Sequence, residues 1–387
     1  MNTQAPAGED MIRITATRQG GAVTQVKVQI PALAWMGPQV IGMTPAAATA
    51  HLHAHASHSP RAHACAVEQA CALALGEGSA DIDTQIATEQ TLAAEMADTH
   101  LRRLLIDWPP HFGFEPRLNR FAEFHRQLIA PSDPDTAFAL GGDVLDLVAR
   151  EMLAGFFNQI RMPHGIGEFI DRLNAGGSLS SVMNGLIAMG PSGPPAGGAS
   201  QLLGTLSAAA WAAGVGHWPS PDFVRQPTFE GAPAETGPLA RHAPSPLVRL
   251  LLERGHRVSA RLFAKAIDVA DCASRMRYPY TDDVPPLLDA VQVEPMVGMA
   301  RVATARGTLL CWVRIADGMI ADCAMVPAGA WNFHPDGPFC REAVSGPAAG
   351  EDLDGARKRL TVLALALDPS ITHIVDVVER PAGKKRA

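Results

Sequence analysis

The sequence predicts a mainly helical α+β fold, in which a long helical core is flanked by β hairpins near the N- and C-terminal ends of the chain. Residues 11–30 alternate polar and apolar side chains on both sides of Gly20-Gly21, which is typical of a β-hairpin. Residues 130–270 have mostly helical patterns. Strand-like runs return over 301–326, with Asp317-Gly318 as the predicted hairpin turn.

Bulk composition limits the classes of protein that the chain can belong to. Its 387 residues, 47% hydrophobic and 18% charged, are enough to bury a large core. A net charge of −7 and a pI near 6.0 argue against nucleic acid as a partner. Six cysteines without a C-x-x-C pair indicate reduced thiols in a cytosolic protein. No export signal or bilayer span is visible, so we expect a cytoplasmic protein with no membrane partner.

Start and stop signals predict three helices after the first hairpin. Thr44 is a natural N-cap for a helix over 45–58. Ser59 would cap a second helix over 60–75, and a third spans roughly 84–106.

The second half of the chain has fewer predicted elements. Amphipathic patterns predict two or three helices over 239–277. After the hairpin of 301–326, we expect a helix near 350–366. A last helix would begin at Asp368-Pro369, with Ser370 and His373 three residues apart on one face.

No internal repeat is visible, and we expect one domain over residues 1–387. Its predicted parts are a β element (1–42), a helical core (43–280), a β-rich segment (281–345) and C-terminal helices (346–380).

Several common catalytic motifs are absent, including G-x-x-x-x-G-K-[ST], H-E-x-x-H, G-x-S-x-G and G-x-G-x-x-G. The most conspicuous local pattern is a histidine-rich run over 51–63. On a continuous helix His51, His55 and His58 would share one face that could hold a borderline metal ion. A solvated polar helix face is the favoured interpretation, because no nearby carboxylate or cysteine completes a site.

Two short stretches share one construction. Residues 59–63 (SPRAH) and 368–373 (DPSITH) each place a helix cap, a proline and a polar side chain one turn into a helix. If the two helix N-termini meet, their free N–H groups form a pocket for an anion, to which Arg306 could add a guanidinium. The residues that we expect to bind the ligand are Ser59, His63, Arg306, Asp368, Ser370 and His373.

The order of these stretches resembles the large subunit of nickel–iron hydrogenases, and more closely the related HupK/HoxV-type maturation proteins. Residues 53–75 are similar to the family's R-x-C-x-x-C-x-x-x-H motif, with Ala56 and Ser59 at the cysteines and His63 at the histidine. Further similar stretches lie at 90–109, 235–248, 305–320 (the Arg-Gly strand pair) and 326–338 (the Trp-Asn loop).

The C-terminal motif resembles D-P-C-x-x-C-x-x-H without its metal ligands. Ser370 and His373 stand where the family has cysteines, and Asp376 stands at the last histidine. Active hydrogenases hold their metals with four thiolates, and none of those four positions is cysteine here. A serine hydroxyl is no substitute for a soft anionic ligand, so we expect neither nickel nor H₂ turnover.

The resemblance implies a non-catalytic cytoplasmic scaffold for the Fe(CN)₂CO fragment of the hydrogenase active site. It also implies a HypC/HupF-type small chaperone and other maturation proteins as partners, with the hydrogenase large subunit as a further one. Cys65 and Cys311 are the nearest thiols and the candidate iron ligands, although both could equally be buried core residues. Two alternatives stay open: a metal-free relative in a respiratory complex, and a large-subunit mimic that binds maturation chaperones without carrying iron.

Overall fold

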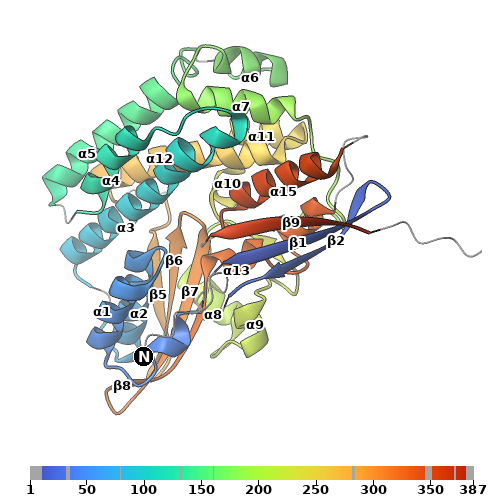
Figure 1. The fold of residues 1–387 in the computed structure, drawn as a ribbon. Coiled ribbons are helices and arrows are strands. Elements are labelled where there is room, and N and C mark those ends of the chain that lie inside the picture. Colours follow the sequence, from blue (N-terminus) through green and yellow to red (C-terminus); the bar gives the residue numbers. More distant parts are fainter. Residues whose placement is uncertain are drawn as a thin grey trace, which may run out of the picture.

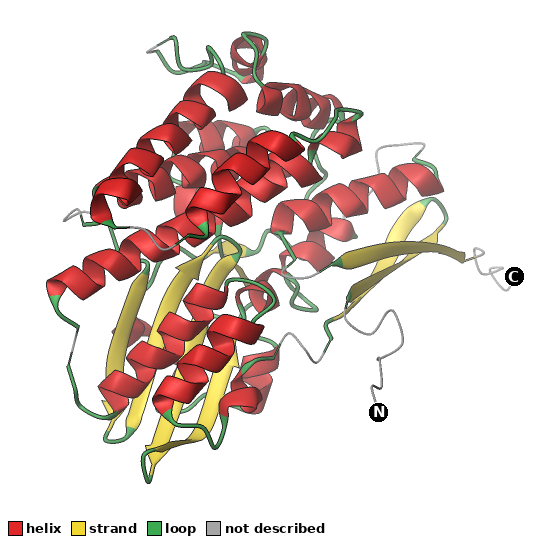
Figure 2. Cartoon of the chain, turned by 60° about the vertical axis from the view of Figure 1, so that its left-hand side comes forward, coloured by secondary structure: helices red, strands yellow, loops and turns green. Residues whose placement is uncertain are grey.

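A computed structural model gives the fold of the chain. It describes residues 11–31, 35–78, 80–130, 133–159, 161–280, 284–344, 351–369 and 372–380. A helical layer lies above two separate β-sheets, and Figures 1 and 2 show the four-stranded and the three-stranded sheet side by side beneath it.

The helical layer is built around two long helices, α3 (Ile82–Arg102) and α12 (Arg257–Arg277), which pack against each other. A π-helical turn over Arg103–Asp107 extends α3, close to the predicted end of that helix. The other helices of this layer are α4 (Leu118–Leu128), α5 (Pro134–Asp146), α6 (Ile166–Leu173), α7 (Ser178–Ala188), α10 (Pro238–His242), α11 (Pro246–Glu253) and α15 (Leu353–Leu367). The predicted helices over 239–277 and 350–366 are therefore confirmed.

The four-stranded sheet is antiparallel, in the order β5-β6-β7-β8. The turn between its last two strands is Asp317-Gly318, as predicted, and both residues have positive φ. α1 and α2 lie over one face of this sheet (Figure 2), and α2 packs directly on its strands. The bounds are β5 (Leu288–Glu294), β6 (Val297–Thr304), β7 (Gly307–Ala316), β8 (Met319–Val326), α1 (Pro45–His55) and α2 (Pro60–Ala74).

Short strands, helices and turns complete the chain. The two-residue strands β3 (Gln201–Leu202) and β4 (Ala234–Glu235) pair with each other in parallel. The short helices are α8 (Ala208–Val215), α9 (Pro221–Arg225), α13 (Ala328–Asn332) and α14 (Pro338–Ala343), with further 3₁₀ or π turns at Gly37–Val40, Pro109–Phe112 and Leu147–Met152.

The three-stranded sheet corrects the prediction for the end of the chain. The predicted hairpin is present as β1 (Ile12–Gln19) and β2 (Ala22–Gln29). Its third strand is β9 (His373–Arg380), which runs parallel to β1 and replaces the predicted last helix. The β-branched run over 374–378 (IVDVV) favours an extended chain, and β1 offers an edge on which it can pair.

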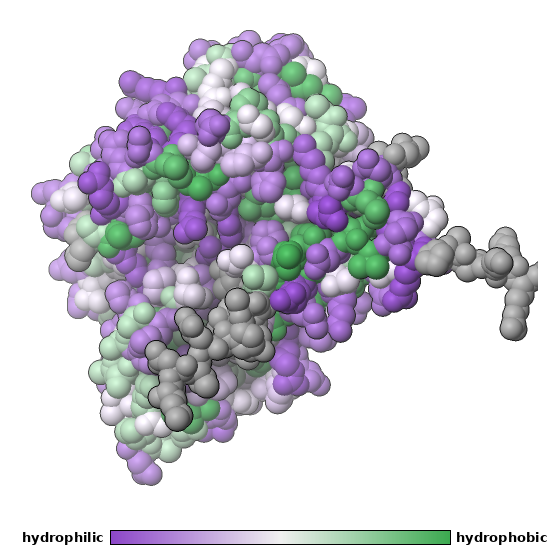
Figure 3. Space-filling view, viewed as in Figure 1, coloured by the Kyte–Doolittle hydropathy of each residue, from purple (hydrophilic) through white to green (hydrophobic). Residues whose placement is uncertain are grey.

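Buried side chains form three clusters. The largest joins α2, α3, α5, α12 and the inner face of the four-stranded sheet. A second lies between the three-stranded sheet and α15, and a third lies around Trp312 and Trp331. On the face shown in Figure 3, hydrophobic surface gathers where β9 and β1 lie, and Ile374 and Val378 of β9 are exposed. None of the described helices is both long and apolar enough to cross a bilayer.

Candidate functional site

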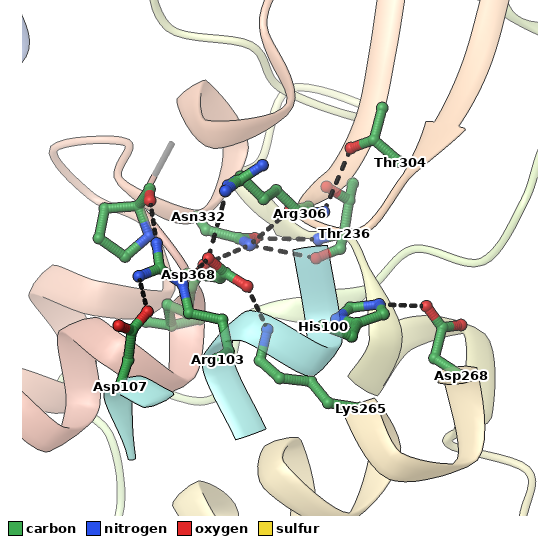
Figure 4. A network of polar contacts seen from close by, with 12 residues as sticks. His100, Arg103, Asp107, Thr236, Lys265, Asp268, Thr304, Arg306, Asn332 and Asp368 are labelled. Carbon is green, nitrogen blue, oxygen red and sulfur yellow. Dashed lines mark hydrogen bonds and ion pairs between the residues drawn. The ribbon is translucent and has the colours of Figure 1, made fainter. Parts of the chain in front are cut away.

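The site is centred on the carboxylate of Asp368, which is only 1% exposed. Asp368 ends α15 in the left-handed conformation with φ 59°, so it is the C-cap of that helix and not the N-cap of another. Its Oδ2 accepts a hydrogen bond from Lys265 Nζ at 2.7 Å, and its Oδ1 accepts one from Arg103 Nε at 2.9 Å. Arg306 Nε lies 3.5 Å from Oδ1 (Figure 4).

Three separate elements bring these basic groups to one carboxylate. Arg103 lies where α3 becomes π-helical, Lys265 lies in the middle of α12, and Arg306 lies in the turn between β6 and β7. Burial alone would raise the pKa of Asp368, but the charges of Lys265, Arg103 and Arg306 outweigh it and hold the pKa well below its usual range. Asp368 is therefore ionised at neutral pH.

Arg103 also connects the site to the chain on both sides. Its Nη1 donates to Asp107 Oδ2 at 2.6 Å, and its Nη2 donates to the carbonyl oxygen of Pro369 at 2.9 Å. The fork of one guanidinium thus fixes the direction in which the chain leaves α15.

Arg306 is the least satisfied polar group of the site. Its side chain is 11% exposed, and its Nε and Nη1 have no hydrogen-bond partner among the described residues. A buried N–H without an acceptor costs roughly 1–3 kcal/mol. Arg306 also lines the cavity described below, so its guanidinium can contact a ligand there.

The Arg-Gly turn and the Trp-Asn segment form one structural unit. Asn332 Nδ2 donates to the carbonyl oxygens of Thr236, Arg306 and Leu367 at 3.2, 3.4 and 3.3 Å. Asn332 Oδ1 accepts from the Thr236 N–H at 3.1 Å. One buried amide therefore fixes the Arg306 turn relative to the end of α15, immediately before Asp368. Gly307 has φ 138°, and a Cβ there would collide with the hydroxyl of Thr236.

A cavity of about 1070 Å³ lies beside this network. Three arginines (Arg102, Arg103 and Arg306) and one carboxylate, that of Asp107, are among the residues that line the cavity. The excess positive charge favours an anionic ligand. The residues that line the cavity are Met36, Gln39, His51, His55, Ser57, Arg102, Arg103, Ile106, Asp107, Pro110, His111, Arg306, Leu365, Thr372 and His373.

His373 lies at the start of β9 and lines this cavity. Burial, and then the charge of Arg103, lowers its pKa to about 4. The imidazole is therefore neutral at pH 7. Of the predicted site residues, Arg306, Asp368 and His373 are thus brought together.

The prediction of a pocket between two helix N-termini is wrong for both helix starts. At Asp368 a helix ends and none begins, because the αL residue and Pro369 stop α15. At α2 the first N–H groups already have an acceptor: Glu95 of α3 receives bonds from the N–H groups of Arg61 (2.8 Å) and Ala62 (3.1 Å). The basic side chains, and not helix dipoles, make this site attractive to an anion.

Ser59 and His63 do not line the cavity. Ser59 has φ 46°, and its side chain makes no capping bond, which corrects the prediction of a capping serine. Its carbonyl oxygen accepts from Nδ1 of His63 at 2.9 Å, and both residues are buried. His63 Nε2 has no partner among the described residues. Ser370 lies outside the described residues.

The two cysteines proposed as iron ligands lie away from the cavity lining. Cys65 faces a different groove, which it shares with His53 and Glu68 on α1 and α2. Cys311 is fully buried in the large core between α2 and the sheet, beside Cys323. Burial raises the pKa of Cys65 to about 12, and the neighbouring thiol of Cys323, together with burial, raises the pKa of Cys311. Both thiols are protonated at neutral pH.

The histidine run does not form a continuous helix face. α1 ends at His55, and His58 lies in the following loop. The rings of His51 and His55 are 4.6 Å apart, while the ring of His58 lies edge-on to that of His63 at 5.2 Å. Among the described residues, no group of three or more His, Cys, Asp or Glu side chains could hold a metal ion.

Sequence reasoning missed three residues of the site: Arg103, Lys265 and Asp107. Lys265 interrupts the apolar run 262–267 of α12 (LFAKAI), and a charge within such a run is a sequence signal that could have identified it. Arg103 is one of two adjacent arginines on an amphipathic helix, and no local pattern separates it from Arg102.

Solved structures identify the fold. The chain superimposes on the Ni-Fe-Se hydrogenase of Desulfomicrobium baculatum with a TM-score of 0.60, covering 92% of this chain and 95% of that one at 16% identity. For the enzyme of Desulfovibrio vulgaris Hildenborough the TM-score is 0.58, with 90% and 94% covered at 16% identity. The fold is that of a nickel–iron hydrogenase large subunit, as predicted.

The sequence relatives are hydrogenase expression/formation proteins. The hydrogenase expression/formation protein HoxV of Cupriavidus necator is 25% identical over 93% of this chain and 96% of its own length. HupK of Azotobacter vinelandii is 30% identical over 38% of this chain, and HupK of Rhizobium leguminosarum bv. viciae is 29% identical over 41%. No known protein-family profile matches the chain. The predicted resemblance to HupK/HoxV-type proteins is confirmed.

Proposed function

We propose that the chain is a non-catalytic maturation factor that carries or passes on the Fe(CN)₂CO fragment of the nickel–iron hydrogenase active site. The names of the sequence relatives and the large-subunit-like fold support a role in hydrogenase maturation. The cargo is the finer part of the proposal, and it rests on the chemistry of the cavity.

One observation carries the cargo assignment. Arg306 lines a cavity with excess positive charge, and its guanidinium has hydrogen-bonding capacity that the described residues leave unused. The cyanides of an anionic iron fragment accept hydrogen bonds, so a guanidinium can hold them by charge-assisted contacts. The cavity is also larger than such a fragment needs, which leaves room for part of a delivering partner.

The test is retention of the fragment by the chain purified without oxygen from cells that express the maturation proteins. We expect cyanide and carbonyl stretches in its infrared spectrum. A charged hydrogen bond contributes roughly 1.5–3 kcal/mol, so Arg306→Gln should loosen the fragment about tenfold or more. Arg225→Gln is the matched control, because Arg225 lies on the exposed helix α9 and pairs with Asp222 on the same helix.

Absence of both stretches from the wild-type chain would contradict the carrier role. Equal retention by Arg306→Gln and wild type would contradict the role of Arg306. We further propose a HypC/HupF-type small chaperone as the partner that delivers the fragment, and the hydrogenase large subunit as its acceptor.

The large-subunit mimic is the second candidate, and the fold favours it as much as it favours the carrier. A mimic would bind the same small chaperone and show no iron stretches. The alternative of a respiratory-complex subunit has no such support, since the sequence relatives are hydrogenase expression/formation proteins.

A further inference from the structure

The donor atoms around the cavity differ from those of a thiolate metal site. Four histidines line it, His51, His55, His111 and His373, and no cysteine is among the lining residues. All six cysteines of the chain are free, and five of them are buried. Cys65, the sixth, opens to the separate groove on α1 and α2.

The described residues are also unsuited to a bare metal ion. A naked divalent ion needs three or four protein donors, and no group of three is present among the residues that the structure describes. A metal that arrives with its own strong ligands needs only one protein bond. The basic side chains can then donate charge-assisted hydrogen bonds to the ligands that the metal brings with it.

We propose that the imidazole of His373, rather than a thiolate, forms the bond between this chain and the iron of its cargo. This inference rests on the proposed carrier function. His373 lines the same cavity as Arg306, and the charges of Arg103 and Asp368 both act on its ring. A neutral imidazole has one ring nitrogen with a free lone pair, which is the form in which histidine binds metals.

The other three histidines are less suited to this bond. The rings of His51 and His55 pack on each other, and His51 Nε2 lies 3.5 Å from Gln39 Oε1. His111 lies in the 3₁₀ turn after α3, where the charges that act on it are those of Asp107 and Lys358. Of the four histidines, only His373 lies in the segment that follows Asp368 directly, at the start of β9.

The reaction is a ligand exchange at iron. The nitrogen lone pair of the neutral imidazole forms the Fe–N bond, and the ligand that the iron had in its delivering partner leaves with its own electron pair. The other ring nitrogen keeps its proton, and neither iron nor protein is oxidised or reduced.

The experiment uses the full chain, loaded in cells, purified without oxygen and separated from its chaperone. Iron X-ray absorption should show a first shell of carbon, nitrogen and oxygen only. His373→Ala should lose the iron and both infrared stretches. His111→Ala, from the same cavity, and His53→Ala, from the groove of Cys65, should keep them.

The His373→Cys variant tests whether the loss of iron in His373→Ala comes only from a folding defect. It should restore iron with a sulfur neighbour, and it should lower the carbonyl stretch because a thiolate donates more electron density than an imidazole. A sulfur shell in the wild-type chain, or wild-type iron content in His373→Ala, overturns the inference and leaves the carrier role intact. A wild-type chain without cyanide and carbonyl stretches overturns the carrier role, and the His373 assignment with it.

Discussion

At the scale of single residues, the site is a buried cluster of charges balanced on one carboxylate. The side chains of Lys265 and Asp368 are 1% and 2% exposed, and each is the other's closest charged partner, at 2.7 Å. Two buried charges are tolerable only as a pair, because removing one leaves the other without compensation. The position that the family fills with the first residue of its D-P-C motif therefore has a structural role here, independent of any metal.

Removing this carboxylate should destabilise the fold strongly. We expect Asp368→Asn to lower the free energy of unfolding by about 3–5 kcal/mol, since Lys265 is left buried and unpaired. Asp107→Asn removes the other partner of Arg103 at a more exposed position and should cost less than about 1 kcal/mol. Urea unfolding of the two variants checks the difference. Similar losses in both would show that Asp368 is not the central carboxylate.

Buried histidines should make the chain sensitive to mild acid. Burial lowers the pKa of His58 and of His63, and the nearby Arg306 lowers both further. Their pKa values in the unfolded chain are near the ordinary value of about 6.5, so below that pH the unfolded state binds more protons. Their contribution to stability is thus fully present above about pH 6.5 and is lost as the pH falls toward their folded values.

The measurement is the free energy of unfolding in urea at several pH values between about 7.5 and 5.5. We expect a decrease over this window in the wild-type chain and a shallower one in His58→Gln, which removes one of the two groups. A free energy that is constant or rises toward pH 5.5 would contradict this account.

At the scale of elements, the contact between α2 and the four-stranded sheet depends on one small residue. Gly298 of β6 faces the backbone of α2 so closely that a Cβ would overlap the carbonyl oxygen of Ala70. A strand glycine normally weakens a sheet, but here it permits the close approach of a helix. That approach sets the position of α2 and hence of His63, which lies on this helix.

Gly298→Ala should therefore force α2 away from β6. Overpacking of this kind typically costs about 1–3 kcal/mol, and thermal or urea unfolding would measure the loss. Gly142→Ala on α5 is the matched control, because nothing lies within 4 Å of its added Cβ and alanine favours the helix. If both alanine variants were as stable as wild type, the close packing at Gly298 would not contribute to the stability of the fold.

At the scale of the whole molecule, the chain has the hydrogenase large-subunit fold without the thiolate ligands that the resemblance assigns to that family's metal site. We expect the purified chain to contain nickel at far less than one atom per molecule and to show no H₂-dependent dye reduction. The physical reason is that the family positions for soft anionic ligands hold Ala56, Ser59, Ser370 and His373. Stoichiometric nickel together with H₂-dependent dye reduction would refute the non-catalytic assignment.

The sequence by itself determined much of the chain's local structure. Turn residues and helix-start prolines placed the first hairpin, α1, α2 and the β7–β8 hairpin, because positive-φ turns and prolines at helix starts are local effects. Motif order also indicated the fold and Arg306. These features depend on neighbours in sequence, or on a pattern spread over most of the chain.

Only the tertiary structure decided how the site is built. Residues 373–380 form a strand because β1 supplies a partner edge, an interaction across the length of the chain that no local pattern encodes. The carboxylate of Glu95 on α3 accepts the first N–H groups of α2, so these groups are not free to form the expected anion pocket. The charges around Asp368 come from α3, α12 and the β6–β7 turn, and their convergence follows from long-range packing of buried surfaces.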